Sequence, residues 1–278
     1  MRKAIILLMS LLAVGLVRPA PSRAAEMTLY ALNVGKADCL LLRAGDAAYL
    51  IDTGRGRTYS AVESALAAEK ITHLDGVIIT HTDADHVGGL KKLLKSGIVI
   101  DHLYTSAFYL PEDDEEEHPV LKAAAKQNIT VETLKSGDTL PFSDGSLRVL
   151  GPLHEAADKD DNNSVILLAE AASGSMLLAG DMEFPEESDL LSAGLIPEAD
   201  VLKVGNHGDN DATSEALLNA VRPKIAVIST STEEKSSTPA NRVLKLLRQW
   251  NVEVWETQNA AVGILVTVRD GEVFAQAK

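Results

Sequence analysis

The chain has 278 residues, of which 46% are hydrophobic, and a formal net charge of −14 at neutral pH. This length and composition suit one large domain or two small ones with a substantial core. An acidic surface repels phosphate backbones, so we do not expect stable binding to nucleic acid. The single cysteine, Cys39, excludes an internal disulfide.

The N-terminal segment predicts export. A basic start precedes an apolar run from Ala4 to Val17, and Ser22-Arg23-Ala24 places small residues at the two positions that a signal peptidase reads. The run is shorter than the roughly 20 residues that span a bilayer. We therefore predict a signal peptide over residues 1–24, a single domain over residues 25–278 without a transmembrane segment, and a secreted, extracellular or periplasmic protein. A membrane anchor is the alternative.

Strands and helices are expected to alternate in the first half of this domain. Short apolar runs between Gly- or Asp-containing turns predict strands, and apolar residues at helical spacing predict helices. Six consecutive acids at 112–117 are interpreted as a solvated loop rather than a metal site. The expected strands are 27–34, 39–43, 47–51, 76–80, 130–134 and 146–150, and the expected helices are 59–69, 87–95 and 119–127.

The second half has the same character. Its expected strands are 165–170, 175–179, 201–204, 225–229, 252–256, 262–269 and 272–275, and its expected helices are 214–221 and 241–250. Strand clusters in both halves predict an α/β fold with two packed sheets and helices outside. Composition alone does not separate this fold from other layered α/β folds.

The densest cluster of potential metal ligands is His81-Thr82-Asp83-Ala84-Asp85-His86, directly after the buried strand expected at 76–80. A turn there can aim His81 and Asp83 to one side and Asp85 and His86 to the other, which suits two divalent ions. Imidazole with carboxylate predicts zinc first, with manganese or iron as alternatives. The helix expected from Val87 would point its positive end at the site and favour an anionic group. A capped turn with surface histidines is the structural alternative.

This stretch resembles the H-x-D-x-D-H motif of the metallo-β-lactamase superfamily. It is more closely similar to the hydrolase domain of ComEC-type competence proteins and their free-standing secreted relatives. The resemblance covers nearly the whole expected domain, through the further blocks 32–38, 50–54, 162–167, 177–181 and 201–208. It implies an αββα sandwich, the metallo-β-lactamase fold, with two packed mixed sheets, helices outside and metal ions at one edge.

The resemblance also implies roles for single residues. Asp181 would bridge the two ions, and His207 would complete a second metal position together with Asp85, His86 and Asp181. Asp52 would support the site from below. We expect Asp85 and Asp181 to be the catalytic residues as well as metal ligands.

The first metal position is expected to be the weaker one. His81 and Asp83 have no obvious third imidazole, and the amide oxygen of Asn163 is the nearest substitute, which suits a hard cation better than zinc. Up to two ions are therefore expected, one bound tightly and one weakly.

The sequence departs from the family pattern in the last blocks. Asn206 stands where relatives carry the first of two adjacent histidines, and Thr238-Pro239-Ala240 stands where they often carry His-Pro-His. The remaining histidines are interpreted as surface or structural residues: His73, His102, His118 and His154.

The expected function is a secreted metallo-hydrolase that cleaves an ester or phosphodiester, in a small molecule or a polymer, with a metal-activated hydroxide. An extracellular nuclease is one form of this hypothesis. The alternative is a non-catalytic metal- or ligand-binding module of the same fold, in which Asn206, Thr238 and Ala240 mark the loss of turnover.

Overall fold

A computed structural model describes residues 26–108, 118–142, 145–156 and 161–278. The signal peptide predicted over residues 1–24 and the acidic run at 112–117 lie outside the described residues.

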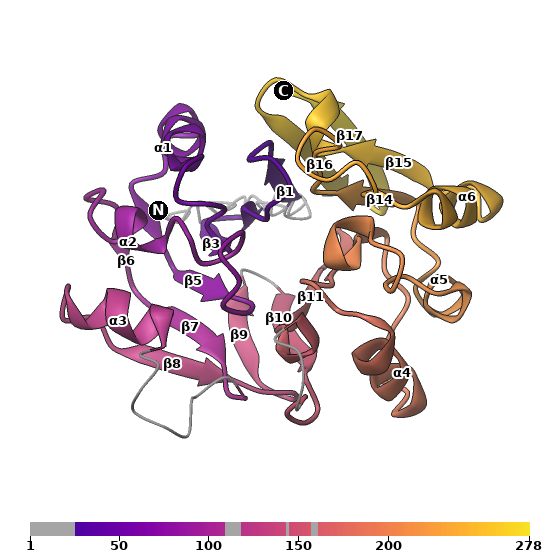
Figure 1. The fold of residues 1–278 in the computed structure, drawn as a ribbon, viewed down its shortest axis with the longest axis horizontal. Helices are drawn as coiled ribbons and strands as arrows, with labels where there is room; N and C mark the ends of the chain where they lie inside the picture. The colour runs from indigo at the N-terminus through magenta and orange to yellow at the C-terminus, as the bar shows by residue number, and fades with distance from the viewer. Residues whose placement is uncertain (1–25, 109–117, 143–144, 157–160) are drawn as a thin grey trace, which may run out of the picture.

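The larger sheet has eight strands in the order β17-β16-β1-β2-β3-β5-β7-β8 (Figure 1). Pairing is antiparallel from β17 to β3 and parallel from β3 to β8, so the sheet is mixed. Its strands are β1 (Met27–Leu32), β2 (Leu40–Ala44), β3 (Ala47–Ile51), β5 (Gly76–Ile79), β7 (Leu103–Ser106), β8 (Val131–Leu134), β16 (Gly263–Arg269) and β17 (Glu272–Ala277).

The second sheet has seven strands in the order β15-β14-β13-β12-β11-β10-β9. It is parallel from β15 to β12 and antiparallel from β12 to β9, so it is also mixed. Its strands are β9 (Thr139–Phe142), β10 (Gly145–Gly151), β11 (Ile166–Ala171), β12 (Gly174–Leu178), β13 (Val201–Lys203), β14 (Ile225–Ile228) and β15 (Glu253–Glu256). Two short strands, β4 (His73–Leu74) and β6 (Val99–Ile100), pair separately.

Helices cover the outer face of each sheet (Figure 1). The first sheet packs against α1 (Tyr59–Ala68), α2 (Leu90–Leu93) and α3 (Pro119–Ala125), and the second packs against α4 (Phe184–Ser192), α5 (Glu215–Val221) and α6 (Asn241–Gln249). Strand β1 shows why this works, because alternate side chains of a strand face opposite sides. Leu29 and Ala31 lie in the core between the sheets, whereas Tyr30 and Leu32 lie under the helices. The predicted αββα sandwich is therefore confirmed.

The helix expected at 87–95 is much shorter than predicted, since α2 begins only at Leu90 and ends at Leu93. A β-carbon at Gly88 would lie 2.3 Å from the carbonyl oxygen of Ala84, and one at Gly89 would lie 2.3 Å from that of Thr53. These close approaches hold the segment as tight turns against the chain after β3. The predicted helix N-terminus at Val87 is therefore wrong, because α2 does not begin at the ligand motif.

Every helix in the described ranges is too short or too polar to traverse a lipid bilayer.

Candidate metal centre

The loop after β5 carries the motif His81–His86 and is fixed by backbone contacts to two earlier loops. Thr53 donates from its amide and its hydroxyl to the carbonyl of His86, at 2.7 and 2.8 Å. The Asp38 amide donates to the carbonyl of Asp85 at 3.2 Å. The motif therefore sits on the chain that follows β1 and β3.

Two loops of the second sheet bring further ligands to the same edge. Strands β12 and β13 are parallel neighbours, so Asp181 and His207, which follow them, emerge on the same side. The sheets are joined here by a hydrogen bond of 3.0 Å from the Val165 amide to the Thr80 carbonyl, next to His81. Asn206 and His207 have φ values of 41° and 53°, a left-handed conformation that non-glycine residues adopt mainly at functional sites.

The ring orientations of His86 and His207 are set by acceptors outside the centre. Nδ1 of His86 lies 2.8 Å from Oδ2 of Asp52, and Nδ1 of His207 lies 2.8 Å from the Ser229 carbonyl oxygen. Because a carboxylate and a carbonyl only accept, each Nδ1 carries a proton and donates it. In the neutral rings the two Nε2 lone pairs then face each other across 3.3 Å. Metal-binding histidines are held in this way.

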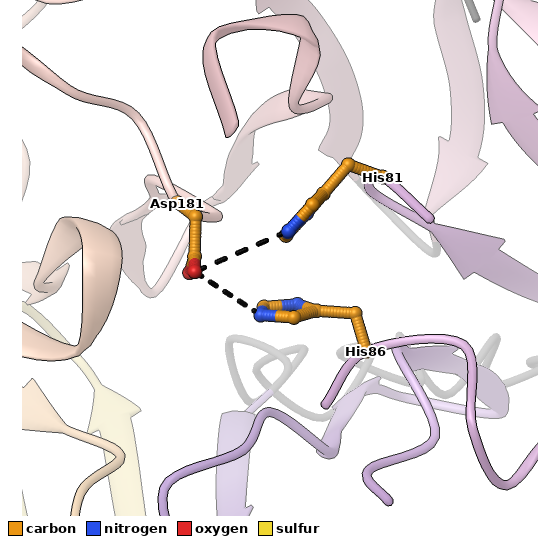
Figure 2. A group of neighbouring side chains, drawn as sticks. All are labelled: His81, His86 and Asp181. Carbon is orange, nitrogen blue, oxygen red and sulfur yellow. Dashed lines mark ion pairs between the residues drawn. The ribbon is translucent and has the colours of Figure 1, made fainter. Parts of the chain in front are cut away.

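Carboxylate oxygens complete this group. Oδ2 of Asp181 lies 3.3 Å from Nε2 of His86 (Figure 2). The same oxygen lies 3.2 Å from Nε2 of His207. Oδ2 of Asp85 lies 3.6 Å from Nε2 of His207. Ligands about 2.0–2.1 Å from a tetrahedral zinc ion are separated by roughly 3.3 Å, so the donors of His86, His207 and Asp181 fit one such ion, with Asp85 slightly farther out. All four residues are buried.

A second, more open group surrounds His81. Its ring nitrogens and the carboxylates of Asp83 and Asp161 can approach within 4.8 Å of one another, with Nε2 of His81 lying 3.8 Å from Oδ1 of Asp161. Nε2 of His81 is also 4.0 Å from Oδ2 of Asp181, so Asp181 lies between the two groups, as Figure 2 shows for both rings. Asp161 was not predicted as a ligand, because no spacing rule links it to the motif.

Asn163 does not take the expected ligand position. Its amide oxygen accepts a hydrogen bond of 2.7 Å from the Ala156 amide, and its amide nitrogen donates to the Ala156 carbonyl. The side chain therefore closes the loop before β11. Asp161, two residues earlier, provides a carboxylate to the more open group around His81 instead.

Asp52 and Asn206 act beside the ligands. Asp52 accepts from the amide and hydroxyl of Thr80, at 2.8 and 2.7 Å, as well as from His86. Asn206 donates to Oε1 of the buried Glu183 at 3.2 Å, which holds the left-handed turn of the His207 loop.

The segment Thr238-Pro239-Ala240, where the sequence also departs from the family pattern, packs against the loop that carries His207. The Ala240 amide donates to the Gly208 carbonyl at 2.8 Å, and Thr238 is fully buried. It supports the His207 loop and brings no imidazole to the centre.

The electrostatics of the centre favour a cation. Burial alone would raise the pKa of the Asp181 carboxyl, but His207 and His86 hold it well below its usual range. Burial alone would lower the pKa of His86, but Asp181 and Asp52 raise it well above the usual value. The carboxylates of Asp181 and Asp52 thus favour positive charge at the ring of His86.

Two charged features of the centre were not predicted. Lys203 and Asp38, both almost fully buried, form an ion pair of 2.8 Å beneath His207. Lys36 and Arg55 contact Oδ2 of Asp85 at 3.3 and 2.9 Å. These contacts join residues distant in sequence, and local patterns carry no signal for them.

The other histidines lie outside this centre. His73 contacts Asp101 at 2.8 Å and His102 contacts Glu132 at 2.7 Å, both at the surface, and His118 is buried. His154 is exposed and lies 3.3 Å from Asp189.

Comparison with known proteins places this arrangement in a family. The sequence profile of the metallo-beta-lactamase superfamily matches residues 32–232. The chain belongs to the metallo-beta-lactamase superfamily. Its described layers and the ligand motif after β5 are therefore those of a fold that binds divalent metals.

Within this superfamily the chain is similar to competence-related proteins. It is 30% identical over 261 residues to ComE operon protein 3 of Bacillus subtilis strain 168, covering 87% of this chain and 33% of that protein. It is 29% identical to Recombination protein 2 of Haemophilus influenzae, covering 85% of this chain and 28% of that protein. The chain thus spans about a third of the length of these relatives.

Among solved structures, the diiron β-hydroxylase CmlA of Streptomyces venezuelae shares the fold, with a TM-score of 0.58 and 14% identity. The likeness covers 91% of this chain and 55% of CmlA.

Proposed function

We propose that this protein is a metal-dependent hydrolase of esters, phosphodiesters included. The observation that carries the proposal is the inward-facing pair of Nε2 atoms of His86 and His207, 3.3 Å apart, beside the buried carboxylates of Asp85 and Asp181. Both Nδ1 protons are committed elsewhere, so the buried donors that remain suit a divalent cation. Zinc is the first candidate, with manganese and iron as alternatives.

The first, weaker position is assigned to His81 and Asp83, with Asp161 as a further ligand and Asp181 between the two ions. This position is more open, because Asp83 is exposed and the Asp161 side chain is 26% exposed. An exposed carboxylate is better solvated, which favours looser metal binding.

Ions bound here supply Lewis acidity and lower the pKa of a water at an open position. In ester hydrolysis the water oxygen bonds to the carbonyl carbon or phosphorus, the ester C–O or P–O bond breaks, and one water proton ends on the leaving oxygen. Asp85 and Asp181 face the centre and would accept hydrogen bonds from this water, which orients it. Asp52 and Ser229 keep the imidazoles in the tautomer that leaves Nε2 unprotonated.

Other functions remain as alternatives with their own support. The name of one relative, Recombination protein 2, concerns recombination, which favours a nucleic-acid substrate, whereas the net charge of −14 disfavours stable nucleic-acid binding. CmlA shows that the fold also hosts a diiron hydroxylase, so the fold alone does not fix the reaction. Loss of turnover through Asn206, Thr238 and Ala240 would leave a binding module.

Export remains part of the proposal and rests on residues 1–24. Sequencing of the secreted protein should begin at Ala25. Intact Met1 in a membrane fraction would contradict this.

The test is a metal-supplemented screen of nucleic acids, phosphodiesters, phosphomonoesters, lactones and carboxylate esters. Hydrolysis that is lost with chelator, restored by zinc or manganese and reduced about 100-fold or more in Asp181→Asn supports the proposal. The exposed His154→Gln is the matched control and should retain activity. Equal turnover in Asp181→Asn, or turnover in excess chelator, would contradict it.

A further inference from the structure

Two cations lie against the outer side of the centre. Lys36 follows β1 and Arg55 follows β3, and their side chains are 14% and 24% exposed. Nζ of Lys36 and Nη2 of Arg55 both contact Oδ2 of Asp85, at 3.3 and 2.9 Å. Arg55 also donates to the Lys36 carbonyl at 3.3 Å, which holds the two cations together.

The position of Lys36 and Arg55 opposes metal binding. The carboxylate oxygen that they contact also lies 3.6 Å from Nε2 of His207, within the tighter ligand group. A cation bonded to a ligand oxygen competes with the metal ion for that oxygen and repels it. The chain has a net charge of −14, so a pair of cationic side chains at the metal centre suggests a role other than metal binding.

Metal binding would leave these cations without a full counter-charge. Two divalent ions balance the four carboxylates of Asp83, Asp85, Asp161 and Asp181. Within the described part of the chain, Lys36 has no other ion pair, and the other partner of Arg55, Glu234 at 3.7 Å from Nε, is shared with Arg57. The Arg55 side chain is 24% exposed, so a ligand can reach its guanidinium.

We propose that Lys36 and Arg55 bind an anionic phosphoryl group of the substrate at the rim of the metal centre. The planar guanidinium can donate two parallel hydrogen bonds to phosphoryl oxygens, and the ammonium adds a point charge. A neutral lactone or carboxylate ester offers no such charge, so the site selects phosphoesters. This inference rests on the proposed hydrolase function.

A polar hollow beside the cations offers space for the rest of the substrate. It has a volume of about 590 Å³, and its walls include Gly35, next to Lys36, and Glu234, which contacts Arg55 and Arg57. Asn33, Gln258 and Asn259 add hydrogen-bonding groups to its lining. These groups suit a polar remainder such as a sugar or an alcohol.

The test measures inorganic phosphate binding to the zinc-loaded full chain by titration calorimetry, with zinc affinity measured in parallel. Arg55→Gln and Lys36→Gln should each weaken phosphate binding about tenfold or more, because each removes a charge-assisted hydrogen bond. Zinc affinity should stay equal or increase, because a competitor for Asp85 is removed. Arg55→Lys should recover only part of the loss, since it restores charge without the planar fork.

The matched control is Arg57→Gln, which removes an exposed arginine that pairs with Glu234 and does not touch Asp85. It should leave phosphate affinity unchanged within about twofold. Unchanged phosphate affinity in both site variants would overturn the inference, and weaker zinc binding with unchanged phosphate would show that the cations only position Asp85. If the wild-type chain binds no metal, the proposed function fails first and this inference falls with it.

Discussion

At the residue scale, the two ligand groups differ in burial and therefore in expected affinity. Asp85 belongs to a buried group with His86 and His207, whereas His81 also belongs to the open group with Asp83 and Asp161. We expect Asp85→Ala to remove the tightly bound ion, because water replaces a buried charged ligand poorly. His81→Ala should keep about one tight ion but lose most hydrolysis. Calorimetric titration decides this, and loss of all metal in His81→Ala with a tight ion kept in Asp85→Ala would reverse the assignment.

A buried acid away from the centre gives a second residue-scale prediction. Both carboxylate oxygens of Glu186 are buried without a hydrogen-bond partner in the described chain, and burial, helped by Asp189, raises its pKa well above the usual value. The folded state then holds a proton that the unfolded state releases above about pH 4.5. Stability from this group is therefore lost as pH rises from that value towards the folded pKa, by about 1.4 kcal/mol for each unit of the shift.

Glu186→Gln should abolish this dependence. Urea unfolding at pH 5 and pH 8 should show the variant gaining on the wild type as pH rises. A constant difference between the two proteins at both pH values would mean that Glu186 is ionised in the folded state. Glu198→Gln, at an exposed acid, is the control and should show no such trend.

At the element scale, the close contact between two loops holds the motif in place. A β-carbon at Gly88 would lie 2.3 Å from the Ala84 carbonyl oxygen and 2.7 Å from the Gly56 amide nitrogen. Gly88→Ala should therefore cost about 1–3 kcal/mol of unfolding free energy and also weaken metal binding, because the loop carrying Asp85 and His86 must shift.

The control for this prediction is Gly97→Ala. A β-carbon there meets nothing within 4 Å, although φ is +85°, so the cost is backbone strain of about 1 kcal/mol alone. Metal affinity should be unchanged in this variant. Equal metal affinity in Gly88→Ala would show that the contact does not position the ligands.

The sequence predicted most strands because their signal is local. Leu29 to Leu32 alternate between two cores, and the apolar runs of β3 and β5 end within one residue of the expected positions. Prediction from sequence failed where contacts between distant parts of the chain determine the local structure. Helix α2 is short because Gly88 and Gly89 meet distant backbone, and α4, β7 and β9 were not predicted.

The site residues also fall into those that local sequence predicts and those that only long-range contacts bring together. The motif of adjacent ligands marks one loop of the centre from sequence alone. Asp161, the Lys203–Asp38 pair and the contacts of Lys36 and Arg55 with Asp85 arise only when separate loops meet. Asn163 was considered as a substitute ligand because of its position in the chain, but its hydrogen bonds to Ala156 direct its side chain elsewhere.

At the scale of the whole molecule, the centre depends on how the two sheets pack, because His81 and His86 follow the first sheet while Asp181 and His207 follow the second. Phe142 lies in the core between the sheets, 1% exposed, with its ring 6.2 Å from that of Tyr49. Phe142→Ala should cost about 3–5 kcal/mol in urea unfolding. Phe274 is 46% exposed, so Phe274→Ala should cost less than about 1 kcal/mol and serves as the control. Equal losses would show that the inter-sheet core is not the main source of stability.

The central claim, that this edge of the sandwich is a metal centre, is tested most directly by metal content. Protein purified without chelator and reconstituted at neutral pH is analysed for zinc, manganese and iron, beside His207→Ala. The account predicts between one and two ions per wild-type chain and loss of the tightly bound ion in the variant. Less than about a tenth of an equivalent in the reconstituted wild type, which is what contamination leaves in a site of normal affinity, would contradict it.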